Sequence, residues 1–226
     1  MPVVGAQYWN CRTSGLERAD EIMRDVILPV IKVHVDAGHL TGANWLGHQI
    51  GGGWDRALAT FAPSMDALLD MRAAILSELN SEHAEAVEEF NNICGNHADY
   101  LWQNQVSSGS LGVTNDVQAS AGVTQYYECD QRREGWTDII VGQTMASVMN
   151  TFVESGQLAS WGWSSHLVGG NTRRILTMRG ADAKSVMNAW GAMTAALNEQ
   201  RPMAMGELLD ICPRHTDYLW SILETI

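Results

Sequence analysis

The 226-residue chain lacks every short motif that would assign a common reaction. It has no GxxxxGK[ST] phosphate loop, no GxGxxG after the first expected strand, no HExxH zinc pair and no GxSxG nucleophile turn. Three consecutive glycines, Gly51 to Gly53, lie between expected strands and predict a turn rather than a phosphate cradle. Function must therefore be argued from the fold and from individual residues.

Basic residues are scarce, since 14 Lys and Arg stand against 26 Asp and Glu, a formal net charge of -12. Nucleic-acid affinity depends on cations that meet phosphates, so this balance predicts no nucleic-acid partner. No apolar run approaches the roughly 20 residues of a membrane helix, so no membrane partner is predicted. The N-terminus lacks a basic region followed by an apolar stretch, and we expect no signal peptide.

There are only four cysteines and no CxxC pair. Their spacing does not resemble that of a small disulfide-rich secreted scaffold. We therefore predict four buried free thiols. Together with the missing signal peptide, they predict a cytoplasmic, reducing location. Disulfide bonding is the alternative that the even count leaves open.

The chain repeats itself at an offset of 118 residues. The segment CGNHADYLW, which begins at Cys94, returns as CPRHTDYLW from Cys212, and about 27 of the 96 positions between 7 and 102 match without a gap. Such internal similarity predicts two related halves. We place them at residues 1–103 and 123–226, joined by a Ser-, Gly- and Asn-rich linker at 104–122.

Each half predicts the element order β-α-β-β-α-β from its hydrophobic periodicity and turn residues. Gly38 and Gly156 should close the first helix of each half in a left-handed conformation. Pro29 could kink that helix, although the second copy has Ser147 at this position. In the first half we expect strands at 3–12, 40–50, 55–62 and from 97, and helices at 16–37, 63–80 and 83–94.

This order is that of the ferredoxin-like unit, whose sheet carries helices on one face only. Over residues 3–103 and 123–223 the duplicated pattern resembles the dimeric α/β-barrel superfamily, fused within one chain. The predicted fold class is α+β, with two ferredoxin-like β-α-β-β-α-β repeats packed sheet to sheet as a pseudo-dimeric α/β barrel. The resemblance implies cofactor-independent monooxygenases, haem-handling proteins and small lyases or isomerases as relatives, which is an analogy of fold.

Two repeated histidines, His48 and His166, lie in the second strand of each half. Side chains alternate across a strand, so His48 and Trp45 face opposite ways. A Trp packs well against helices, which leaves the histidines toward the interior, where histidine can act as a base. A hydrogen-bonded structural histidine is the alternative.

Further candidates surround these histidines. Tyr8 and Tyr126 could line an interior pocket, and Glu128 could supply a catalytic carboxylate beside His166. Arg56 and Arg174 could hold a substrate carboxylate at the barrel mouth. For each of the charged residues the alternative is a structural ion pair or an exposed edge position.

The repeated pairs His97-x-Asp99 and His215-x-Asp217 fall on one side of an extended segment. An Asp can orient a His in a catalytic dyad, but polar residues at a helix-to-strand junction also cap backbone groups. A metal site needs three or four converging ligands, and none is predicted.

We predict a small-molecule-binding α/β-barrel protein, with a cofactor-independent oxygenase- or lyase-type activity in a pocket between the sheets. The alternative is a non-catalytic stress or interaction protein whose repeated polar residues are structural. The sequence identifies no cofactor, and a homodimer is compatible with it. The direction in which His48, His166, Arg56 and Arg174 point distinguishes the two functions.

Overall fold

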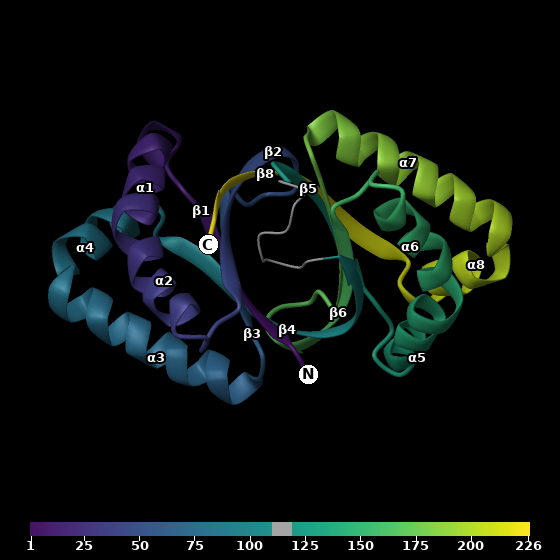
Figure 1. Ribbon diagram of the computed structural model, residues 1–226, viewed down its shortest axis with the longest axis horizontal. Coiled ribbons are helices and arrows are strands. Elements are labelled where there is room, and N and C mark those ends of the chain that lie inside the picture. The colour runs from purple at the N-terminus through teal and green to yellow at the C-terminus, as the bar shows by residue number, and fades with distance from the viewer. Residues whose placement is uncertain (110–118) are drawn as a thin grey trace.

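The computed structural model describes residues 1–109 and 119–226. Within them, eight strands form a closed barrel in the order β1-β3-β2-β8-β5-β7-β6-β4, with antiparallel neighbours. The helices gather in two groups on opposite outer sides of the barrel (Figure 1). No helix in the described ranges has the length and apolar character needed to cross a membrane.

The same element order occurs in each half of the chain. The first half contains β1 (Val3–Asn10), α1 (Leu16–Ile22), α2 (Leu28–Asp36), β2 (Gly42–Gly51), β3 (Arg56–Ala62), α3 (Met65–Glu82), α4 (Ala84–Ile93) and β4 (Asn96–Gly109). The second contains β5 (Ala121–Glu128), α5 (Glu134–Ile139), α6 (Ala146–Glu154), β6 (Ser160–Val168), β7 (Arg174–Gly180), α7 (Ala183–Gln200), α8 (Pro202–Ile211) and β8 (Arg214–Thr225).

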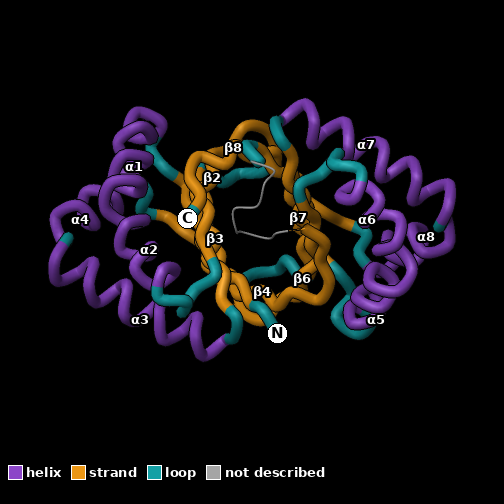
Figure 2. The backbone as a smooth tube through the Cα atoms, viewed as in Figure 1, coloured by secondary structure: helices purple, strands orange, loops and turns teal. Residues whose placement is uncertain are grey.

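The two groups of four strands join at their edges. The orders β4-β1-β3-β2 and β8-β5-β7-β6 meet through the β2–β8 and β4–β6 pairs, so the strands form one continuous ring (Figure 2). The expected α/β barrel is present as a closed eight-stranded barrel over the described residues, and hydrogen bonds between the edges of the two groups close it. Closure removes the exposed strand edges that an open sheet would leave.

The expected linker is shorter than its composition suggested. Strand β4 continues to Gly109 and pairs with β6, so residues 104–109 belong to the barrel. Ser, Gly and Asn are poor strand formers by composition alone, but here the neighbouring strand supplies hydrogen-bond partners. Residues 110–118 of that linker lie outside the described residues.

The first long helix of each half is interrupted by a π-helical turn, at Met23–Ile27 and at Ile140–Met145. Because the second half has no proline there, Pro29 is not the cause of the irregularity. The predicted glycine caps are confirmed: Gly38 has φ 77° and Gly156 has φ 73°, values that favour glycine.

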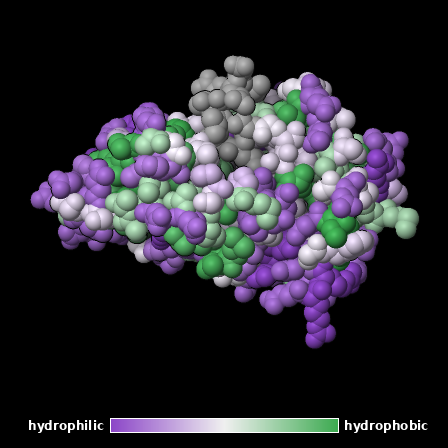
Figure 3. Space-filling model, turned by 60° about the horizontal axis from the view of Figure 1, so that its bottom comes forward, coloured by the Kyte–Doolittle hydropathy of each residue, from purple (hydrophilic) through white to green (hydrophobic). Residues whose placement is uncertain are grey.

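Strand alternation divides the apolar residues into three cores. Trp45 and Trp163 are fully buried between the barrel and the helices of their own halves. Tyr8 and Tyr126 belong to a third core inside the barrel. On the face that Figure 3 shows, hydrophobic residues form small groups among hydrophilic ones.

The prediction of four free thiols is wrong. Cys11 is bonded to Cys94, and Cys129 to Cys212. The end of β1 pairs with the start of β4, so the residues that flank these strands come together, and the second half repeats this arrangement. Disulfides are typical of oxidising compartments, so the thiols no longer support a cytoplasmic location.

Candidate functional site

The barrel encloses a cavity of about 100 Å³ that is lined by strands of both halves. Inward-facing side chains at alternate strand positions form its wall, as the pleat of a strand requires. An engineered apolar cavity of about 150 Å³ accommodates benzene, so this one suits a compact molecule.

Aromatic rings from both halves pack around Tyr8 on the cavity wall. Trp54, in the β2–β3 connection, stacks on Tyr8 with ring centres 4.3 Å apart and on Tyr218 at 5.4 Å. Glycine allows this connection to lie against the ring below: a Cβ on Gly52 would stand 1.6 Å from Tyr218 Cζ. The Gly53 N–H donates to the Tyr218 hydroxyl at 2.7 Å, which fixes the layer in place.

Tyr8 and Tyr126 lie on the cavity wall, where the sequence had placed them. Their rings meet edge to face with centres 5.6 Å apart. Burial raises the pKa of both phenols well above the ordinary value. Both hydroxyls are therefore protonated at neutral pH and act as hydrogen-bond donors rather than as bases.

Two indoles complete the inner wall. Trp102 and Trp220 are each 1% exposed, and within the described part of the chain their indole N–H groups have no acceptor in hydrogen-bond geometry. Trp220 stacks on Tyr218 with ring centres 4.8 Å apart. A buried donor that forms no hydrogen bond costs about 1–3 kcal/mol. An indole N–H without an acceptor on a cavity wall therefore indicates that a ligand supplies the acceptor.

The two halves contribute chemically different walls. At three pairs of equivalent lining positions, 118 residues apart, the side chain is apolar in the first half and hydroxylated in the second. The pairs are Ala6 and Thr124, Leu46 and Ser164, and Ala59 and Thr177. Asn44 is a polar residue of the first-half wall, and its Oδ1 already accepts from Thr225. Arg179 also lines the second-half wall, and burial lowers the pKa of its guanidinium.

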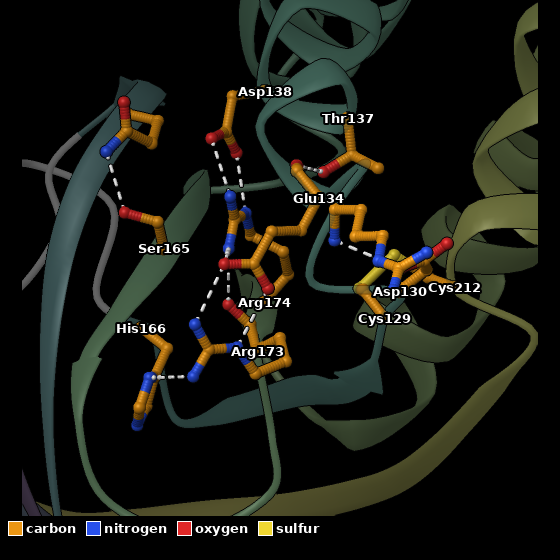
Figure 4. A network of polar contacts seen from close by, with 12 residues as sticks. Cys129, Asp130, Glu134, Thr137, Asp138, Ser165, His166, Arg173, Arg174 and Cys212 are labelled. Atoms are coloured by element: carbon orange, nitrogen blue, oxygen red, sulfur yellow. Dashed lines mark hydrogen bonds and ion pairs between the residues drawn. A yellow bond between two sulfur atoms is a disulfide. The ribbon is translucent and has the colours of Figure 1, made fainter.

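The repeated histidines have the inward orientation that alternation predicted, but they lie beside the hairpins and do not line the cavity. His48 Nε2 bonds the Gly51 carbonyl. His166 Nδ1 accepts from Arg173 Nη1 at 2.7 Å, because a guanidinium can only donate (Figure 4). Burial, together with the charge of Arg173, lowers the pKa of His166. These contacts favour the structural alternative.

Arg56 and Arg174 face the helices rather than the barrel mouth. Arg56 makes two bonds of 2.7 Å to Asp20 in α1. Arg174 binds Asp138 in α5 at 2.8 and 2.9 Å (Figure 4). The expectation of a substrate clamp at the entrance is therefore corrected to two partly buried ion pairs between the barrel and the helices. The geometry is bidentate, which is the strong form of this interaction.

The carboxylate expected beside His166 does not reach the interior. Glu128 ends β5, pairs with Arg214 at 2.7 Å and keeps 45% of its side chain exposed. An exposed ion pair at a strand end lies outside the cavity and cannot reach a ligand bound there. This is the exposed edge position that the sequence left as the alternative.

The repeated His-Asp pairs also lie at the outer surface. His97 Nδ1 is 3.3 Å from Asp99 Oδ1, and His215 Nδ1 is 2.8 Å from Asp217 Oδ1. The four side chains are partly exposed at the starts of β4 and β8, and none of them lines the cavity. Asp99 also accepts from Arg72, and Asp217 accepts from Gln125, so both pairs make contacts between side chains that favour a structural role.

Sequence reasoning missed the polar half of the cavity wall. The signal was present in the differences between the copies, at the strand positions where Ala or Leu is replaced by Thr or Ser. It also missed Asp20 and Asp138, although this aspartate is repeated at the same offset. An aspartate repeated in a helix that faces a repeated arginine is a recognisable salt-bridge pattern.

The described residues do not fit a haem or a metal centre. A haem needs an axial His, Cys, Met or Tyr and a space for the macrocycle. Tyr8, Tyr126 and Met178 line the barrel cavity, but its volume of about 100 Å³ leaves no room for the macrocycle, and the cavity between the second-half helices and the barrel measures about 40 Å³. All four cysteines are in disulfides, and no histidine lines either cavity. No group of three His, Cys, Asp or Glu side chains converges within residues 1–109 and 119–226.

No family model matches the chain, and no curated protein matches it by sequence. Solved structures do match along its whole length. A proposed monooxygenase from Fusobacterium nucleatum gives a TM-score of 0.68 at 10% identity, covering 99% of this chain and 93% of that one. An anthrone oxidase-like protein gives 0.61 at 10% identity, with 100% and 92% covered. A chlorite dismutase from Candidatus Nitrospira defluvii gives 0.56 at 8% identity, with 98% and 91% covered.

At such identities the likeness establishes the fold alone. It supports an α+β chain with a closed, eight-stranded antiparallel barrel over the described residues. The chemistry of the chain must come from its own cavity.

Proposed function

We propose that this chain, whose fold is that of the dimeric α/β-barrel superfamily, binds a compact organic molecule inside its barrel. The observation that carries the proposal is the interior cavity, whose wall combines protonated phenols with indole N–H groups that lack an acceptor. Binding pockets commonly pair an apolar lining with a few polar groups that fix orientation.

Filling the cavity tests this function. Ala59 lies on its wall, and Ala59→Phe should abolish the thermal stabilisation that a ligand such as cyclopentanone gives. At 100 times its Kd a ligand stabilises by about 2.7 kcal/mol, or about 5–11 °C for a chain of this size. Ala59→Thr, which introduces the residue found at the equivalent position 177, is the matched control and should keep the shift. Equal shifts in both variants would place the ligand elsewhere.

A second candidate is an oxygenase that works without a resident cofactor. Buried phenol and indole donors can stabilise the negative oxygen of an enolate, which is the species that reacts with O2. The balanced change is CH2 + O2 → C=O + H2O at a carbon next to a carbonyl, and the acidic proton leaves to water. The described lining holds neither a carboxylate nor an imidazole, so the substrate must carry an already acidic C–H.

Oxygen uptake tests this activity. Tyr8→Phe and Tyr126→Phe should each slow O2 consumption with a compact 1,3-diketone by at least about tenfold, as loss of an oxyanion donor does. Anthrone itself, with three fused rings, exceeds a cavity of about 100 Å³. Uptake that is unchanged in both variants would assign the reaction to another site.

The architecture supports a further part of the proposal. The strand orders β4-β1-β3-β2 and β8-β5-β7-β6 are the same, and both disulfides span 83 residues within their own half. We infer two ferredoxin-like repeats, fused in tandem, as the units of this barrel. A homodimer remains a prediction, which light scattering would test, because the barrel already closes within one chain.

A further inference from the structure

The two halves of the cavity wall offer a ligand different partners. Ala6, Leu46 and Ala59 present only carbon to the interior, whereas Thr124, Ser164 and Thr177 at the equivalent positions present hydroxyl groups. A ligand that was apolar on all sides would leave the second-half hydroxyls unmatched. A ligand that was polar on all sides would lose its hydration against the first-half wall.

The free donors define what the polar end of the ligand must be. Thr177 Oγ1 already donates to the Gly162 carbonyl at 3.4 Å, and the Thr124 hydroxyl bonds Tyr126. The Trp102 indole on the first-half wall interacts with the Tyr8 hydroxyl, whereas the Trp220 indole N–H has no partner in the described structure. An indole can only donate. Ser164, which is 7% exposed, adds a hydroxyl on the same wall. The matching group is a hydrogen-bond acceptor.

We infer that the ligand is a compact carbonyl compound whose apolar body lies against the first-half wall and whose oxygen accepts from Trp220 or Ser164. This inference rests on the proposed small-molecule function. The two donors assigned to the oxygen, an indole N–H and a hydroxyl, are neutral and match a neutral oxygen, because burying an anion beside neutral groups is costly. Arg179 on the same wall is the cation that a carboxylate would need, so a carboxylate ligand is the comparison that tests this choice. The cavity size limits the body to a ring of about five or six atoms.

A matched pair of ligands separates the contribution of the hydrogen-bond acceptor to the affinity from that of the ligand's shape. Cyclopentanone and methylcyclopentane have the same outline, but only the ketone accepts a hydrogen bond. Isothermal titration would give both affinities, and the indole N–H signal of Trp220, assigned from its absence in Trp220→Phe, would report contact. We expect that signal to move downfield with the ketone and not with the hydrocarbon.

Substitutions test whether Trp220 and Ser164 on the second-half wall donate to the ligand's oxygen. Trp220→Phe and Ser164→Ala should weaken cyclopentanone binding about 2- to 10-fold, as loss of one hydrogen bond does, without weakening methylcyclopentane. Ser165→Ala is the matched control, because the adjacent serine bonds Gln105 and does not line the cavity. It should change neither affinity. Unfolding curves would establish that each variant is folded.

The outcomes are distinct. If neither compound binds, the proposed function fails, and the inference fails with it. If both bind and the two cavity variants weaken them equally, the small-molecule function stands but the acceptor assignment is wrong. Tighter binding of cyclopentanecarboxylate than of the ketone would show an anion site and would overturn the carbonyl class, as would an equal loss in Ser165→Ala.

Discussion

Removing the disulfides should lower stability by an amount that the loop lengths determine. Each bridge closes 83 residues of chain. On the chain-entropy model, cross-linking a loop of this length destabilises the unfolded state by about 4.5 kcal/mol at 25 °C. For a chain of this size that corresponds to about 9–18 °C in Tm per bridge.

The test compares the wild type with the paired substitution of Cys129 and Cys212 by alanine. Alanine is preferred to serine because Cys212 is fully buried and a hydroxyl there would lack a partner. Circular dichroism would follow thermal unfolding with and without a reductant. The paired substitution of Cys11 and Cys94 should behave alike, since its loop has the same length.

Thiol titration of the unfolded chain gives the decisive control. Without a reductant it should find no free thiol, and after reduction it should find four. Four thiols before reduction, together with a Tm that does not respond to the reductant, would refute both the pairing and the calculated stabilisation.

Three further predictions concern the barrel and its helices. Asp138→Ala removes two short hydrogen bonds of the buried Arg174 guanidinium, whose remaining carboxylate contact is a longer one of 3.6 Å with Glu134, and should cost about 1.5–3 kcal/mol in urea unfolding. Asp25→Ala, at an exposed ion pair, should cause no measurable change. Gly52→Ala should destabilise by about 1–3 kcal/mol because its φ is 44° and its Cβ would meet Tyr218, while Gly53→Ala faces open space and should be tolerated in the same assay. The pKa of His166 is lowered by burial, so the unfolded state takes up its proton first: stability should fall as pH drops below about 6.5, and His166→Gln should flatten that slope.

The repeat of the two halves and the alternation of side chains along each strand could be predicted from the sequence for a physical reason. An offset of 118 residues predicts two halves with the same element order, and a period of two within a strand decides that Trp45 and His48 face opposite ways. Both inferences depend only on local geometry. The glycine caps at Gly38 and Gly156 are of the same kind, since a left-handed φ is a property of one residue.

The disulfide and ion-pair partners of the repeated cysteines and arginines could not be predicted, because they depend on which strands and helices become neighbours in the fold. The repeat associates Cys11 with Cys129, but the β1–β4 pairing brings Cys11 to Cys94. Arg56 could equally have pointed into a barrel mouth, and only the position of α1 supplies Asp20 as its partner.

The sequence by itself determined the two halves, the order of their elements and the inward or outward direction of most strand residues. The tertiary structure decided which of those residues share a cavity. The repeated His and Arg residues were the most visible polar candidates, yet their contacts are with hairpins and helices. The cavity instead depends on positions where the copies differ, such as Leu46 and Ser164, and on Trp220. A binding site is a convergence of distant segments, and a local pattern along one strand records the direction of each side chain without recording what it faces.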